Sequence, residues 1–135
     1  MELARSIPPA VWTRPSPNSG WTYRDLLVHL AVGDWVCQTV LRAVVANERL
    51  DVAATLASVD AGNERLRQER ASRSIEELIA EVEAEGEETQ ELLARLADAD
   101  ESRGQEDAPM SLGEYLRQFP GHDRAHLDEL RTALP

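Results

Sequence analysis

The sequence contains no lysine, a single cysteine and few aromatic residues. All 14 basic residues are therefore arginine, and aromatic side chains make up 4% of the 135 residues. Because Cys37 is alone, no internal disulfide can form, and nothing indicates an oxidising compartment, so we predict a cytoplasmic location. An aliphatic content dominated by Leu, Ala and Val, with so few aromatics, favours helices over a β-sandwich or barrel.

Other absences exclude whole classes of function. The N-terminus lacks the apolar stretch of a signal peptide, and the longest apolar run, residues 26–46, is interrupted by His29, Asp34 and Arg42. We therefore expect neither secretion nor a membrane span. Residues 74–107 hold 13 acids and two arginines, so that this segment carries the whole net charge of −11. Without a basic surface, nucleic-acid binding is not expected, and the acidic run is typical of a solvated helix face.

The length suits one domain, covering residues 1–135, with a single hydrophobic core. Four of the seven prolines fall within residues 1–20, which excludes a long helix in this N-terminal segment. Only residues 2–7 could form a short helical turn before the prolines begin.

The first strong helix is predicted from Thr22 to about Asn47. Thr22 and Asp25 have the spacing of a capping box, and Trp21 stands where it could pack on Leu26 as a hydrophobic staple. Apolar residues then recur with helical period along the whole segment.

Further helical segments follow with less uniform patterns. Residues 51–56 and 60–66 read as two short helical pieces. A capping box at Ser74 and Glu77 opens a helix that should stop near residue 98. Residues 98–109 then form a polar linker.

The last helix is predicted over residues 111–134, where Ser111 and Glu114 form a third capping box. Pro120 interrupts its pattern. It either kinks the helix or separates two helices, because proline cannot donate the helical hydrogen bond to the carbonyl of Leu116. No strand is expected, and the pattern predicts an all-α protein.

The chain has three histidines, and all fall on apolar stripes. His122 and His126 stand one turn apart, and His29 shares the inward face of the first helix with Gly33, which should leave space beside its imidazole. A third imidazole facing an i, i+4 pair would complete a facial metal site with open coordination positions. Alternatively, His122 and His126 lie on a half-exposed face, and His29 is a hydrogen-bonded core residue. Convergence is favoured because three buried imidazoles need polar partners, which one shared ion provides.

Other chemistry-bearing residues are weaker candidates. Asp34 and Asp123 either accept hydrogen bonds from ligand imidazoles or face solvent. Cys37 should pack in the core, and Trp35 and Tyr115 should fill it. No residue is assigned a catalytic role.

Two segments, residues 21–31 (WTYRDLLVHLA) and 122–126 (HDRAH), resemble the DinB-like superfamily of metal-binding four-helix bundles. That superfamily includes the mycothiol-dependent maleylpyruvate isomerase N-terminal domain and the bacillithiol S-transferases. The resemblance covers roughly residues 18–133 and implies an all-α, up-down helical bundle. It implies that a histidine after the Trp motif joins two residues of the last helix around zinc, nickel or a similar ion. Carried over by position, the ligands are His29, His122 and His126.

The chain departs from the superfamily at its N-terminus, where only the Pro-rich segment precedes Trp21. The first helix of the bundle is thus expected to be short or missing. Either a partner chain completes the bundle, making a homodimer, or the start of the chain omits a helix. Residues 60–65 resemble the family's loop near the cleft.

The resemblance implies a metal-dependent thiol transferase of the mycothiol type, or a related detoxification enzyme. Such a protein would bind a divalent transition metal, zinc or nickel, a low-molecular-weight thiol cosubstrate and a small-molecule substrate. The alternative is a non-enzymatic protection or binding protein, or a dimeric scaffold in which the metal is structural.

Overall fold

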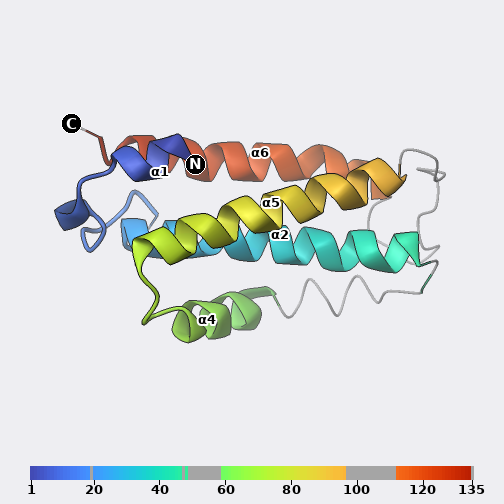
Figure 1. Ribbon diagram of the computed structural model, residues 1–135, viewed down its shortest axis with the longest axis horizontal. Helices are drawn as coiled ribbons and strands as arrows, with labels where there is room; N and C mark the ends of the chain where they lie inside the picture. Colours follow the sequence, from blue (N-terminus) through green and yellow to red (C-terminus); the bar gives the residue numbers. More distant parts are fainter. Residues whose placement is uncertain (19, 47, 49–58, 97–111, 135) are drawn as a thin grey trace.

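The computed structural model describes residues 1–18, 20–46, 48, 59–96 and 112–134. Its elements are α1 (Glu2–Ser6), η1 (Pro9–Val11), α2 (Tyr23–Val45), α4 (Val59–Glu69), α5 (Ile75–Leu96) and α6 (Leu112–Arg131). No strand occurs among these residues, so the all-α prediction is confirmed. Helices α2 and α5 run in one direction and α4 and α6 in the other, with α2 in contact with each of the other three (Figure 1).

Helix α2 begins where the capping box predicts. The Thr22 hydroxyl accepts a hydrogen bond from the Asp25 backbone N–H at 3.2 Å, and the Asp25 carboxylate accepts one from the Thr22 N–H at 2.9 Å. Trp21 packs against the core cluster that contains Leu26, as a staple requires. These local contacts fix the residue at which the helix starts. They thereby fix which turn of the helix carries His29.

Helix α5 also starts at its predicted capping box. Ser74 N–H donates to the Glu77 carboxylate at 2.6 Å, and Glu77 N–H donates to the Ser74 hydroxyl at 3.2 Å. The helix then packs along α2. Their contact includes the fully buried Gln38, whose amide donates to the backbone carbonyl and the carboxylate of Glu85.

The N-terminal segment closes one end of the bundle. Helix α1 has five residues, so the expectation of a short first helix is confirmed. Ile7 and Trp12 are each 4% exposed and share a core cluster with Leu130 near the end of α6. Arg5 ties the segment to α5 by donating to both carboxylate oxygens of Glu83, at 2.7 and 2.8 Å.

The later helices settle two open points. Helix α6 continues through Pro120, so the alternative of two separate helices is wrong. Residues 60–66 lie within α4. The piece predicted at 51–56, the linker at 98–109 and the cap at Ser111 lie outside the described residues.

One expectation about the core is wrong. Trp35 does not fill it, because its side chain is 40% exposed. The side chain of Tyr115, which carries the same expectation, lies outside the described part.

Helix α2 is also the one described helix that is long and apolar enough to cross a membrane by length and composition. In the bundle, 62% of the apolar stretch is buried. The central helix of a packed bundle has the same length and composition, so this feature is weak evidence for a membrane span.

Candidate metal centre

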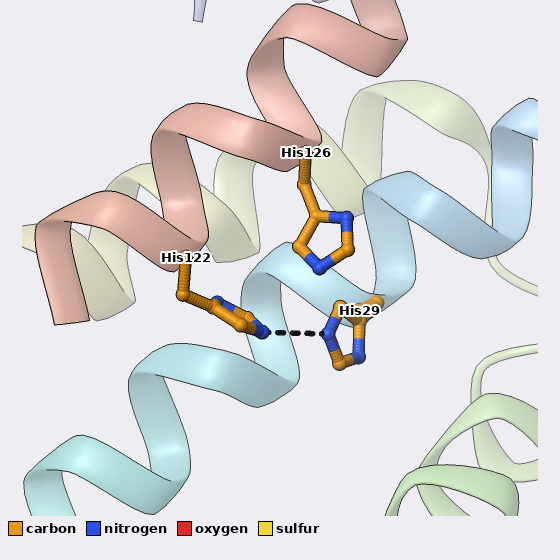
Figure 2. Close-up of side chains that lie close together, drawn as sticks. All are labelled: His29, His122 and His126. Atoms are coloured by element: carbon orange, nitrogen blue, oxygen red, sulfur yellow. Dashed lines mark hydrogen bonds between the residues drawn. The ribbon is translucent and has the colours of Figure 1, made fainter. Parts of the chain in front are cut away.

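The structure brings the three predicted histidines together between α2 and α6. His29 comes from the second turn of α2, and His122 and His126 come from successive turns of α6 (Figure 2). One ring nitrogen from each can be chosen so that all lie within 4.8 Å of one another. The Nε2 atoms of His29 and His122 are 3.2 Å apart. The i, i+4 spacing thus turns both α6 rings toward the facing helix, as expected.

Two of the rings are oriented by carboxylates. Nδ1 of His122 lies 3.1 Å from Oδ1 of Asp123, and Nδ1 of His126 lies 2.8 Å from Oε2 of Glu129. A carboxylate that accepts the Nδ1–H of a histidine leaves the Nε2 lone pair available to an ion. In Figure 2 these Nε2 atoms face His29.

The sequence singles out only one of these two carboxylates. Asp123 takes the role proposed for it, whereas Glu129 is absent from the predicted set. Its signal is the i+3 spacing from His126, which places both side chains on one helix face. The side chain of Asp34 lies outside the described part of the chain.

His29 differs from His122 and His126 because no carboxylate contacts its ring among the described residues. Its Nδ1 atom is buried without a hydrogen-bond partner within the described part of the structure. Burial, followed by the proximity of His126 and His122, lowers the pKa of His29 from 6.5 to about 4. The ring is therefore neutral at physiological pH, which is the form that binds metals.

Gly33 makes room for a different imidazole from the one expected. A Cβ atom at position 33 would lie 3.6 Å from Cε1 of His122 and 3.8 Å from Oδ1 of Asp123. The expectation that this glycine leaves space beside His29 is wrong. One turn beyond His29 on α2, its missing side chain faces α6 and lets the His122–Asp123 pair approach.

The cluster is buried at one side and open at the other. The side chain of His126 is 13% exposed, and that of His122 is 42% exposed. A small molecule could therefore approach from the His122 side. Cys37, which is 1% exposed, packs with Val40 and Leu41 in an apolar core cluster, as expected.

A cavity of about 220 Å³ adjoins His29 on its other side, between α2 and α4. Trp21 and His29 line it from one side, and Asn63, Glu64 and Arg67 line it from α4. The segment that resembles a family loop near the cleft is thus helical here, but it does supply cavity residues. Its position beside a ring of the cluster makes the cavity part of the same site.

The polar wall of this cavity is internally paired. Arg67 donates to Asp25 at 3.3 Å and to Glu64 at 2.9 Å. Burial alone would raise the pKa of Asp25, but the hydrogen bonds from Thr22 and Arg67 outweigh it and lower that pKa. Asp25 is therefore a carboxylate at neutral pH, and it links the cap of α2 to α4.

The donor set suits a divalent transition metal. Three neutral imidazole nitrogens are ligands that zinc and nickel accept. Tetrahedral nitrogens at zinc-bond distances are about 3.3 Å apart, close to the 3.2 Å between His29 and His122. The nitrogen of His126 also lies within 4.8 Å of the other two. Three protein ligands would leave at least one coordination position open.

The chain was compared with known proteins. A family model described as the mycothiol maleylpyruvate isomerase N-terminal domain matches residues 1–130, which includes every helix described above except the last residue of α6. Comparisons with curated proteins and with solved structures gave no match.

Proposed function

Because the chain belongs to the mycothiol maleylpyruvate isomerase N-terminal domain family, within the DinB-like superfamily, we propose that it binds one divalent transition metal through His29, His122 and His126. We further propose that it is a metal-dependent thiol transferase of the mycothiol type, or a related detoxification enzyme. The family name supplies the thiol and the class of reaction.

The convergence of the three imidazoles carries the metal proposal. Their nitrogens meet within 4.8 Å, and carboxylates hold two of the rings by Nδ1. Burying imidazoles side by side is unfavourable when their polar nitrogens lose water and gain no partner in the protein. A shared ion offsets that cost for one nitrogen of each ring.

The open side of the cluster supports an enzyme over a structural metal. Structural zinc sites are closed by four protein ligands, whereas catalytic sites use three and leave a position for substrate. Here three histidines converge, and His122 is 42% exposed. When bound, such an ion lowers the pKa of a thiol or water that it holds.

The chain's own residues would supply orientation and binding. Asp123 and Glu129 fix the rings of His122 and His126 by accepting from Nδ1. Asn63, Glu64 and Arg67 offer hydrogen-bonding groups in the cavity beside His29, which suits a small, polar cosubstrate.

Metal analysis of protein without a His tag tests the first part of the proposal. We expect about one ion per chain, lost in His126→Ala, and higher thermal stability with metal than after chelation. Arg124→Ala, on an exposed position of the same helix, is the matched control and should keep its metal. A chain that binds no metal and is equally stable with and without chelator would refute the site.

A second assay tests catalysis. The metal-loaded protein is incubated with mycothiol, and in parallel with bacillithiol and glutathione, together with maleylpyruvate or electrophiles. Thiol-dependent turnover that disappears in His122→Ala supports the enzyme. Stoichiometric metal without turnover would instead favour the protection protein or the scaffold, and turnover that persists in the histidine variants would reject the mechanism.

The proposed homodimer requires its own measurement. Light scattering gives the mass in solution, to be compared with 15.0 kDa for one chain. A monomer at all concentrations would refute completion of the bundle by a partner chain without affecting the metal site.

A further inference from the structure

His29 is the one ring of the cluster whose Nδ1 has no hydrogen-bond partner in the described structure. Asp123 and Glu129 serve His122 and His126, but Nδ1 of His29 is buried without a partner in the described structure. Its Nε2 hydrogen-bonds Nε2 of His122 at 3.2 Å, but these are the nitrogens that an ion would take up. With an ion bound, packing must therefore hold the His29 ring.

Trp21 provides that packing. Its ring centroid lies 4.7 Å from that of His29, with the planes tilted by 60°. The same indole lies 6.5 Å from His126 in a stacked arrangement with an interplanar angle of 28°. Trp21 therefore contacts rings from both helices that form the cluster. Aromatic pairs at these separations attract each other beyond the effect of burial alone.

The backbone of Trp21 is held in place by a tight turn. The backbone N–H of Trp21 donates to the carbonyl of Asn18 at 3.1 Å, and the backbone carbonyl of Trp21 accepts from the N–H of Ser16 at 2.8 Å. Gly20 adopts a φ of +85°, which glycine accommodates without strain. The next residue, Thr22, is the cap of α2. The backbone of Trp21 is thus anchored on both sides.

We propose that Trp21 is a positioning residue, whose indole fixes the His29 ring by packing in place of the missing hydrogen-bond partner. The effect of Trp21 on metal affinity rests on the proposed function, but its packing against His29 does not. Removing the indole frees the rotation of His29, so that part of the metal-binding energy must then be spent on ordering the ring.

The metal-free protein gives the first test. In Trp21→Leu we expect the NOEs between the ring protons of His29 and those of His122 and His126 to disappear, and in Trp21→Phe we expect them to remain. The chain contains only three histidines, so these signals are readily assigned. Trp35→Leu is the matched control, because Trp35 lies on the same helix as His29 and is 40% exposed. Circular dichroism identifies variants that fail to fold, and in that case Trp21→Met, which keeps apolar bulk without a ring, replaces Trp21→Leu.

Titration with Co²⁺ gives the second test. We expect Trp21→Leu to weaken Co²⁺ binding about tenfold, the lower end of the effect of losing an outer-shell partner. Trp21→Phe should recover most of the affinity and the visible Co²⁺ spectrum, which reports ligand geometry. Trp35→Leu should change neither.

The outcomes separate this inference from the proposed function. If the wild-type protein binds no Co²⁺, the metal proposal fails, and the NOEs alone decide the role of Trp21. If the wild-type protein binds Co²⁺ and folded Trp21→Leu keeps both its affinity and its NOEs, the positioning role is overturned and the metal site stands.

Discussion

Nδ1 of His126 lies 2.8 Å from Oε2 of Glu129, which is three residues further along α6. This contact is shorter than the 3.1 Å between His122 and Asp123, and it is better buried, since the His126 side chain is only 13% exposed. A carboxylate acceptor fixes the tautomer of an imidazole and raises its basicity as a ligand. Among the three rings, His126 is therefore the one whose orientation is best determined before any ion arrives.

Glu129→Ala should weaken metal binding by about tenfold or more, because loss of an outer-shell acceptor typically has that effect. The fold should persist, since Glu129 is partly exposed. Competitive titration with a chromophoric chelator measures the affinity. Asp128→Asn is the matched control, because this neighbouring carboxylate is 58% exposed and pairs with Arg131 instead. Equal affinities in the two variants would mean that Glu129 does not orient the ligand.

Gly33→Ala should stabilise the protein by up to about 1 kcal/mol, because alanine is the better helix former. A Cβ there would meet Cε1 of His122 at 3.6 Å, which is an ordinary van der Waals distance. Gly86→Ala, where a Cβ meets nothing within 4 Å, should give a similar gain and serves as the control. Thermal unfolding measures both.

A larger side chain at the same position should act differently. Gly33→Leu extends into the place of His122, so we expect weaker metal binding with little change elsewhere in the bundle. If Gly33→Leu binds metal as tightly as the wild type, the close approach of α2 and α6 at Gly33 does not shape the site.

The features that the sequence predicts correctly are local ones. The starts of α2 and α5 follow from capping boxes, in which the partners are three residues apart. The inward direction of His29 and the common direction of His122 and His126 follow from helical period alone. These signals do not depend on how the helices pack, which is why they are readable before the fold is known.

The features that the sequence misjudges depend on helix packing. Whether Gly33 faces His29 or His122 is set by the rotation of α6 against α2, which no local pattern specifies. Likewise, Trp35 lies on an apolar helix, yet it is 40% exposed in the described structure. Trp21 reads as a helix staple, and only the assembled bundle brings its ring to His29 and His126.

Thr22→Ala should lower the free energy of unfolding by about 1 kcal/mol, the usual effect of losing an N-cap side chain. The Thr22 hydroxyl accepts from Asp25 N–H and also contacts the Asp25 carboxylate at 2.6 Å. Thr39→Ala is the control, because among the described residues the Thr39 hydroxyl bonds the carbonyl of Trp35 one turn earlier and caps no helix. Denaturant unfolding that shows equal losses for the two variants would contradict the capping role.

The metal-free protein should lose stability as the pH falls through the range between the two pKa values of His29. The unfolded chain binds a proton at its ordinary pKa of 6.5, whereas burial and the neighbouring histidines delay protonation of the folded chain to about 4. Above pH 6.5 the ring is neutral in both states and the difference vanishes. Below it the unfolded state binds more protons, so stability declines by up to about 3 kcal/mol before pH 4 is reached.

Denaturant unfolding in the presence of chelator, at pH values in steps of about one unit from 7.5 to 4, measures the decline in the free energy of unfolding. Acidic side chains also titrate near the lower end, so the comparison is with His29→Gln, which keeps them and removes only this imidazole. The variant should show a shallower decline between pH 6.5 and 5, where few carboxylates titrate. Parallel curves for the two proteins would show that His29 is not held neutral by burial, and the ring would then be too exposed to serve as the buried ligand.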